Sequence, residues 1–413
     1  MSITFIHNGT LIDGLGGAPV PNAVVLIEDD RIVAAGPSDK IEKPNGELVE
    51  LDAEKGFILP GLIDAHVHMV CEGFDIPARI ITPFSHHFYR ALGFMRRTLD
   101  AGITTVRDGG GVDFGIKQAA DEGLFPAPRM QISVSVLTIT GGHIDFWMKS
   151  GADINLIPPY PGYPGLCIRC DGVAEVRRGV REVFRAGAEV VKLCMTGGVL
   201  SPSSHPKQVQ FSEEELAAMV DEAARHGENR LMAHAQALDG IKAAVRAGIH
   251  SIEHGIYLDD EVIGMMIERG TFLVPTLLAP IAVVEIGEAT GKMPKWAVEK
   301  AKNAIEAHFE SARKAYAAGV KIAMGTDAGV MPHGTNLREL GLLCKIGMSP
   351  MEALVAATKT AAECLGWEDR VGSIEAGKLA DVVITRTDPL ADITSLEDTK
   401  NVAVVLKGGK RVK

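Results

Sequence analysis

The sequence lacks the features that mark membrane, secreted and nucleic-acid-binding proteins. None of its apolar runs reaches the length of about 20 residues that a transmembrane helix needs. Residues 1–6 include neither a basic segment nor a long apolar one, so we expect no signal peptide. The formal net charge of -11 disfavours nucleic acid or an anionic membrane as a partner. We therefore expect a cytoplasmic protein with neither kind of partner.

Cysteine is also scarce, with six residues scattered over 413 positions. This pattern fits reduced thiols better than a disulfide framework. Cys167 and Cys170 have the spacing of half a zinc site, but no suitable second pair follows them, so we interpret them as structural. What the chain does have is an ordinary enzyme-like composition, and a length that suits one large barrel with an accessory domain.

Short β-rich segments occur at both ends of the chain. They are residues 4–7, 23–28 and 31–36 near the N-terminus, and residues 380–385 and 401–406 near the C-terminus. Turn-forming residues separate them. Because chain termini often lie close together, we predict one small β-sandwich domain built from residues 1–56 and 368–413.

The middle of the chain alternates between strand-like and helix-like segments. The strand candidates are residues 57–64, 104–107, 131–136, 190–193, 231–234, 251–254, 272–275 and 322–325. Ser212 and Glu215 form a capping box that opens one helix, and helices are also expected over 239–247, 298–318 and 350–365. This repeated alternation predicts an α/β fold with a (β/α)₈ TIM barrel over residues 57–367.

Metal-ligand residue types stand at the ends of several strand candidates. His66 and His68 lie on the same face of a strand, and neutral imidazole is the commonest metal ligand in proteins. His234 and His254 end two further strands, and Asp327 follows the last. Taken singly, each histidine could be a hydrogen-bonded core group, and Asp327 could cap a helix. Together they indicate a metal site where the strands of a barrel end.

Taken together, these residues resemble the amidohydrolase superfamily, in particular its imidazolonepropionase-like and prolidase-like branch. The resemblance covers essentially the whole chain, and its motifs are residues 59–68, 104–108, 140–143, 191–198, 234–235, 253–255 and 325–327. It implies a metal-dependent hydrolase that cleaves a carbon–nitrogen bond in a small-molecule amide. Because relatives often form symmetric oligomers, we expect a homo-oligomer.

The resemblance implies a binuclear site with six protein ligands. The more buried ion matches His66, His68 and Asp327, the more exposed ion matches His234 and His254, and a carboxylated Lys192 bridges both. A bare ammonium beside two dications would be repelled, whereas carboxylation gives Lys192 an anionic oxygen. Mononuclear deaminases and imidazolonepropionase proper lack this lysine. Two divalent ions are therefore expected, with zinc favoured and manganese or cobalt left open.

The implied reaction is attack on the amide carbonyl by a hydroxide that bridges the two ions. Asp327 takes its proton as general base and returns it to the leaving amine as general acid. His143 matches a substrate-contacting histidine, with capping of its loop as the alternative. His333 could line the pocket or simply pack. Gln236 stands where dipeptidase-like members often carry a tyrosine; it can still donate a hydrogen bond to the substrate.

This departure at Gln236 keeps the substrate open among dipeptides, N-acyl amino acids and aryl amides. The alternatives are a cyclic-amide hydrolase or deaminase, and a catalytically silent relative, which the complete ligand set disfavours. Four aromatic residues are expected to line either a substrate pocket or a subunit interface: Phe146, Trp147, Tyr160 and Tyr163. His86 and His87 are expected on an exposed loop.

Overall fold

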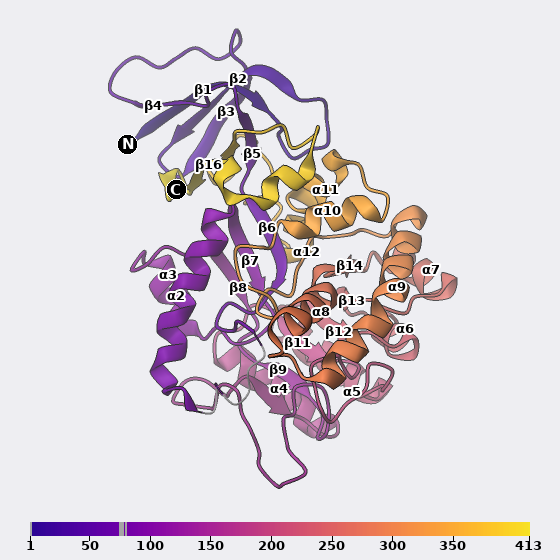
Figure 1. Ribbon diagram of the computed structural model, residues 1–413. Helices are drawn as coiled ribbons and strands as arrows, with labels where there is room; N and C mark the ends of the chain where they lie inside the picture. Colours follow the sequence, from indigo (N-terminus) through magenta and orange to yellow (C-terminus); the bar gives the residue numbers. More distant parts are fainter. Residues whose placement is uncertain (1, 74–77, 79–80) are drawn as a thin grey trace.

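The computed structural model describes residues 2–73, 78 and 81–413. The two ends of the chain lie together on one side of a larger α/β unit (Figure 1). No helix among the described residues is both long enough and apolar enough to cross a membrane.

The two ends of the chain share one sheet. Its strands are β1 (Ile3–Leu11), β2 (Val20–Glu28), β3 (Arg31–Pro37), β4 (Val49–Asp52), β5 (Phe57–Pro60), β15 (Val382–Thr385), β16 (Val402–Lys407) and β17 (Lys410–Arg411). Strand β5 joins the two ends, because it pairs with β1 on one side and with β15 on the other. Alternate residues of β2 enter different apolar clusters, with Val25 and Ile27 in one and Val24 and Leu26 in the other. Both faces of the sheet are therefore covered.

The larger unit contains two parallel sheets. One consists of β6 (Leu62–Val67), β7 (Ile103–Asp108) and β8 (Arg129–Ile132). The other consists of β9 (Val136–Thr138), β10 (Cys167–Arg169), β11 (Val191–Cys194), β12 (Leu231–Ala235), β13 (Ser251–His254) and β14 (Phe272–Val274). Residues 321–328 connect them, since Ala323 donates to the Leu273 carbonyl and Met324 accepts from the Ala65 amide. The predicted α/β class is confirmed, with parallel sheets arranged as in a TIM-barrel-like domain.

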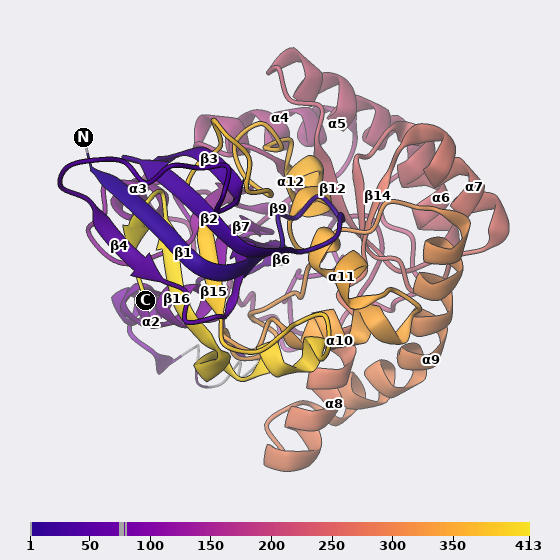
Figure 2. The ribbon, with the colours of Figure 1, turned by 90° about the horizontal axis from the view of Figure 1, so that it is seen from above.

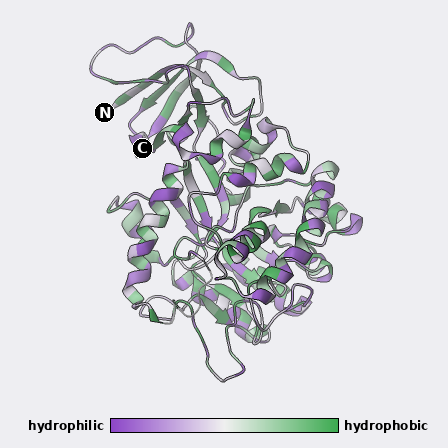
Figure 3. Cartoon of the chain, viewed as in Figure 1, coloured by the Kyte–Doolittle hydropathy of each residue, from purple (hydrophilic) through white to green (hydrophobic). Residues whose placement is uncertain are grey.

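Helices surround these parallel strands (Figure 2). They are α2 (Phe84–Asp100), α3 (Phe114–Asp121), α4 (Val173–Arg185), α5 (Glu213–Arg225), α6 (Leu238–Ala247), α7 (Asp260–Arg269), α8 (Leu278–Thr290), α9 (Lys295–Ala318), α10 (Arg338–Lys345), α11 (Pro350–Ala356) and α12 (Lys359–Leu365). The predicted capping box of Ser212 and Glu215 opens α5. The helices carry hydrophobic and hydrophilic residues together, as expected where only one face is buried (Figure 3).

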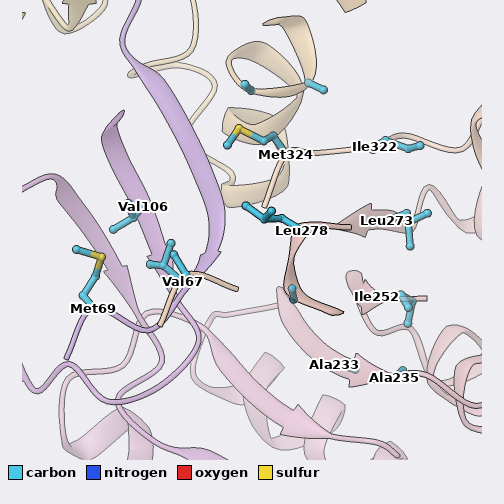
Figure 4. Packing of buried hydrophobic residues seen from close by; sticks show 14 of the residues in the cluster. Val67, Met69, Val106, Ala233, Ala235, Ile252, Leu273, Leu278, Ile322 and Met324 are labelled. Carbon is cyan, nitrogen blue, oxygen red and sulfur yellow. The ribbon is translucent and has the colours of Figure 1, made fainter. Parts of the chain in front are cut away.

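Apolar and polar residues alternate along the parallel strands. Val67, Val106 and Ile252 belong to the largest apolar cluster, which also contains helix residues (Figure 4). The neighbouring residues His66, Arg107 and Glu253 are buried as well, and they contact one another. The strands therefore pack their apolar side chains against the helices and collect polar side chains in a shared interior.

Several predicted elements are divided in the structure. The strand expected over 57–64 is divided at Gly61 into β5 and β6, which belong to different sheets. A Cβ at Gly61 would lie 2.0 Å from the Thr104 hydroxyl, so this position requires glycine. The strand expected over 131–136 is interrupted around Val134, whose φ of 64° is left-handed. Residues 322–325 form no strand, and Ile322 makes a single isolated bridge to Leu273. The helix expected over 350–365 is two helices, separated at Thr358 by a non-helical backbone.

The structure also tests two smaller predictions. His86 and His87 lie in α2 rather than on a loop. None of the six cysteines, all of them among the described residues, forms a disulfide bond, and Cys167 donates to the Ile144 carbonyl at 3.6 Å, in keeping with a structural role.

Candidate metal centre and active site

Three predicted ligands converge where β6 ends. His66 Nε2 and His68 Nε2 lie 3.8 and 3.3 Å from Asp327 Oδ1. Each residue offers one possible ligand atom, an imidazole nitrogen or a carboxylate oxygen, and these three atoms lie within 4.8 Å of one another. Asp327 has a left-handed φ of 61°, an unfavourable conformation that the surrounding structure must hold. This geometry fits a divalent cation, because imidazole nitrogens and a carboxylate oxygen together suit zinc.

His234 and His254 extend this cluster from two neighbouring strands. His234 lies one residue before the end of β12, His254 is the last residue of β13, and their ring centroids are 4.5 Å apart. The His254 ring lies 5.3 Å from that of His66, which joins the two groups of ligands. His254 Nδ1 contacts the Thr276 hydroxyl at 2.6 Å, and this contact fixes the ring. Burial lowers the pKa of both histidines well below the usual value, so their rings are neutral and free to bind a cation.

Lys192 lies at the centre of the cluster. Its side chain is buried on β11, with Nζ 3.1 Å from His66 Nε2. No carboxylate among the described residues forms an ion pair with it. Burial lowers the pKa of Lys192, and it lowers the pKa of His66 well below the usual value, with the charge of Lys192 adding to that effect. A lowered pKa increases the fraction of neutral amine, which is the form that can react with carbon dioxide.

Glycines leave room for the ligand rings. A Cβ at Gly109 would lie 3.2 Å from His66 Nε2 and 3.3 Å from His68 Cε1. A Cβ at Gly198 would lie 2.3 Å from the ring of His143. Side chains at these positions would press on rings that are already packed together. The two glycines therefore keep the space around the ligand set open.

Two buried carboxylates that the sequence analysis passed over support His66. Glu253 Oε2 lies 2.9 Å from His66 Nδ1, and Glu253 Oε1 accepts a hydrogen bond from Arg107 at 2.9 Å. Asp64 accepts hydrogen bonds from the His66 amide and from the Thr326 hydroxyl. Burial raises the pKa of Asp64 to about 6 in spite of these bonds. Carboxylates that hold a ligand histidine commonly fix its orientation and tautomer.

The sequence contains a signal for both carboxylates. Glu253 directly precedes His254 in a short strand, and Asp64 lies two residues before His66 on the same strand face. A charged residue in a buried strand needs a partner. Glu253 finds His66 and Arg107 on two other strands, and Asp64 finds the His66 amide and the Thr326 hydroxyl.

His143 lies beside the ligands in a fixed orientation. Its ring stacks on His234 with centroids 4.2 Å apart, and its Nδ1 lies 2.7 Å from Ser201 Oγ. The Ile144 amide donates to the same hydroxyl oxygen, so the hydroxyl hydrogen is available for Nδ1. This arrangement leaves the ring proton on Nε2. Burial lowers the pKa of His143 to about 3, so the ring is a neutral hydrogen-bond donor.

Ser201→Ala is expected to lower kcat/KM about tenfold, because loss of the hydroxyl frees His143 to adopt the other tautomer and removes one hydrogen bond. Steady-state kinetics against the wild type measures the effect. Ser203→Ala, a change to an exposed neighbour that bonds only the Asp145 carbonyl, is the control. An unchanged kcat/KM in Ser201→Ala would show that the hydroxyl does not position His143.

The ligand cluster forms the floor of a cavity of about 130 Å³. Besides the six predicted ligands and His143, its walls are mostly apolar: Val136, Ile144, Phe146, Leu156, Leu166, Leu200 and Val330. A second cavity of about 50 Å³ shares Asp327, His143, His234 and His254 with the first. An apolar pocket with a few converging polar groups is the usual form of a binding site for a small molecule.

The remaining predicted substrate residues lie in different places. Gln236 lines the second cavity. His333 lines neither cavity; its ring stacks on Phe94, and its Nε2 lies 2.8 Å from the Cys71 carbonyl. This placement gives His333 a packing role and offers no support for contact with a substrate.

Only one of the four aromatic residues reaches the main cavity. Phe146 forms part of its wall, whereas Trp147 is exposed. Tyr160 and Tyr163 stack on each other with centroids 4.8 Å apart and line neither of the two cavities. Leu156 and Leu166, which were not predicted from the sequence, form part of the wall of the main cavity.

Together, the parallel sheets and the buried ligand set define a hydrolase that acts on carbon–nitrogen bonds. The chain belongs to the amidohydrolase family, whose model matches residues 57–412. An ochratoxinase from Aspergillus niger is 35% identical over 425 residues, which cover 100% of this chain and 87% of that protein.

Solved structures agree with this assignment. A prolidase complexed with N-methylphosphonate-L-proline has a TM-score of 0.92 and 33% identity, with 100% of both chains covered. A Xaa-Pro dipeptidase with methionine bound in its active site has a TM-score of 0.89 and 34% identity, with 99% of both chains covered. The predicted resemblance to the prolidase-like branch is confirmed.

Proposed function

We propose that the protein is a binuclear metal-dependent amidohydrolase that cleaves the amide bond of a dipeptide, an N-acyl amino acid or an aryl amide. The observation that carries this proposal is the convergence of four histidines and one aspartate around the buried amine of Lys192. A cluster of buried bases without a cation would be costly, since their lone pairs would lack partners. The donor set fits two divalent ions, with zinc favoured.

Carboxylation of Lys192 completes the ligand set in this proposal. The neutral form of the amine adds to carbon dioxide, one N–H proton passes to solvent, and the product is a carbamate whose single negative charge is shared by two oxygens. Those oxygens replace a basic nitrogen at the centre of the cluster, which supplies the negative charge that two dications require. The same residue favours this function over the cyclic-amide hydrolase or deaminase alternative.

Two divalent ions, when bound, would polarise the amide carbonyl and lower the pKa of a water molecule. Asp327 is placed to take a proton from that water and to hand it to the leaving nitrogen. Burial alone would raise the pKa of Asp327, but contact with His68 and nearby positive charge lower it below the ordinary value. The carboxylate is therefore ionised at neutral pH, ready to accept a proton. His143 donates from Nε2 to a substrate oxygen.

The finer features of the fold belong to the same proposal. We infer that both parallel sheets and residues 321–328 form one (β/α)₈ barrel over 57–367, with residues 1–56 and 368–413 as a two-layer β-sandwich. The hydrogen bonds of Ala323 and Met324 across the seam support closure. A cytoplasmic homo-oligomer remains the expected state.

Metal analysis of the purified protein tests the binuclear site. We expect about two divalent ions per chain by inductively coupled plasma mass spectrometry, and loss of amide hydrolysis after chelation, with recovery on adding zinc. One ion per chain in a fully active sample would contradict the two-metal proposal and favour the mononuclear alternative.

A further inference from the structure

Glu339 is a buried carboxyl group that the proposed reaction does not use. Its side chain belongs to α10, is 0% exposed and lines neither of the two cavities beside the ligand histidines. No lysine, arginine or histidine among the described residues forms an ion pair with it. Burial raises the pKa of Glu339 to about 8, so at neutral pH the folded chain holds a proton there that the unfolded chain has released. Such a group lowers the stability of the fold at neutral pH, which indicates that it is retained for another reason.

The carboxyl group of Glu339 holds the first turn of α8. The Leu277 amide donates to Oε1 at 2.7 Å, and the Leu278 amide donates to Oε2 at 2.8 Å. The first amides of a helix have no carbonyl partner within the helix, and both leucines are fully buried, away from bulk water. Leu278 is also part of the largest apolar cluster (Figure 4). Glu339 therefore fixes the point where α8 begins.

Thr276 directly precedes this turn and has an unfavourable backbone conformation. Its φ of 51° lies in the left-handed region, which a β-branched residue rarely adopts. Such a conformation persists only where the surrounding structure imposes it. The bonds to Glu339 fix the peptide groups that follow Thr276, and the Thr276 carbonyl accepts from the Ala279 amide at 3.1 Å. Glu339 thus helps to impose the conformation of Thr276.

The Thr276 hydroxyl in turn contacts one of the proposed metal ligands. Thr276 Oγ1 lies 2.6 Å from Nδ1 of His254, and both side chains are buried. This contact leaves Nε2 as the ring nitrogen that can bind an ion. His254 also has a left-handed φ, of 74°, so its own backbone does not favour this position. Partners of the second ring nitrogen commonly orient a ligand histidine and fix its tautomer.

We propose that Glu339 is a positioning residue for the metal centre, on which it acts through Thr276 and His254. Its two bonds to the start of α8 keep Thr276 in the left-handed conformation, and Thr276 keeps the His254 ring turned toward the other ligands. The inference rests on the proposed function and adds to the metal centre a residue from a helix outside both cavities. Binding of the ion at His234 and His254 depends on Glu339 more strongly than binding of the ion at His66.

Zinc titration of the metal-free protein tests the proposal. Glu339→Gln is expected to weaken one of the two zinc-binding steps by about 10- to 100-fold, the usual effect of losing a residue that supports a ligand. The reason is that glutamine has one acceptor oxygen, and its NH₂ group would face the second amide donor. The other step is expected to change by less than about threefold. A chromogenic chelator that competes for zinc measures both steps.

Glu222→Gln is the matched control, because Glu222 is also a buried carboxylate but accepts from Arg177 and Arg181 of α4. This variant is expected to leave both zinc-binding steps unchanged. Glu339→Asp, which keeps both oxygens on a shorter side chain, replaces Glu339→Gln if that variant does not fold. Unchanged zinc binding in the folded Glu339 variant, or equal weakening in Glu222→Gln, would overturn the proposal.

A double-mutant cycle tests the route through Thr276. Thr276→Val removes the hydroxyl and keeps the shape of the side chain. In that background Glu339→Gln is expected to weaken zinc binding by less than about threefold further, because the contact through which Glu339 acts is already absent. Losses that multiply in the double variant would show that Glu339 acts by another route and would contradict the proposal.

Nuclear magnetic resonance of the metal-free protein gives a readout that does not depend on the proposed function. In protein labelled with ¹⁵N-histidine, His254 is expected to hold one ring tautomer in the wild type and a mixture of both in Glu339→Gln. Its signals are identified by their absence from His254→Asn. A change of tautomer without amide hydrolysis would contradict the hydrolase and leave the positioning role in place. Hydrolysis with two bound zinc ions, and the same tautomer and zinc affinity in wild type and Glu339→Gln, would do the reverse.

Discussion

Asp327→Asn is expected to lower kcat by about 10²- to 10⁴-fold, the usual contribution of a general acid–base group. Asparagine has nearly the same shape as aspartate, but its amide cannot accept a proton from water. The carboxylate also lies 3.3 Å from His68 Nε2 and 3.8 Å from His66 Nε2, so its negative charge compensates the positive charge at the site. The measurement is kcat on an N-acyl anilide, with metal content determined on the same sample.

The metal content decides how the loss is interpreted. A variant that retains both ions and loses kcat identifies Asp327 as the proton carrier, whereas a variant that also loses an ion shows mainly its role as a ligand. Asp369→Asn changes an exposed aspartate outside both cavities and is the control, with kcat expected to match the wild type. Near-normal kcat in Asp327→Asn would remove Asp327 from the proton-transfer role.

The histidine and aspartate ligands can be predicted because the end of a strand, and the type of residue found there, are both recognised from a short stretch of sequence. His66 and His68 are neighbours on one strand face, His234 and Asp327 each follow a mostly apolar run, and His254 ends a short strand candidate. Parallel strands bring their carboxyl ends to one mouth, so a local pattern becomes a prediction about three-dimensional proximity. The structure places all of these side chains around one cavity.

What the sequence does not predict depends on contacts between distant segments. Glu253 becomes a support for His66 only because β13 and β6 face the same interior, with Arg107 as the compensating charge. Ser201 reaches His143 through a loop whose path is set by tertiary contacts. The division of the first strand at Gly61 has the same origin, since β5 pairs with β15 of the terminal sheet and β6 pairs with β7 of a parallel sheet. None of these contacts leaves a periodic trace in the sequence.

The residues that form the cavity walls are also not predicted from the sequence alone. Phe146 is one of the aromatic residues expected at a pocket or an interface, and its side chain reaches the cavity. Tyr160 and Tyr163 stack on each other and do not line this cavity. Leu156 and Leu166 come from the same long loop and form the wall. Loop composition thus indicates that a wall exists, but the choice of residues depends on how the loop folds.

Lys192→Ala is expected to abolish binding of at least one ion and to lower kcat/KM by more than the about 10- to 100-fold that follows loss of a residue supporting a ligand. The reason is that alanine removes the only side chain at the centre of the cluster that can be converted into a bridging anion. Acetate or propionate is expected to restore part of the activity, because a small carboxylate can occupy the vacated space. Metal analysis and kinetics with and without added acid measure both effects.

Lys321→Ala is the control, since it removes a surface lysine paired with Glu363 and is expected to leave metal content and kinetics unchanged. Full activity of Lys192→Ala without added acid would contradict the bridge.

Lys192→Met separates function from packing. In the metal-free protein this change replaces a buried amine, which lacks a carboxylate partner among the described residues, by an apolar chain of similar length. Tm of the metal-free protein is therefore expected to stay the same or rise, as when buried charges are replaced by apolar side chains. In the metal-loaded protein Tm is expected to fall below that of the wild type, because the variant loses the stabilisation that bound ions provide. Opposite responses of the two forms would show that Lys192 is buried for the ions and not for the fold.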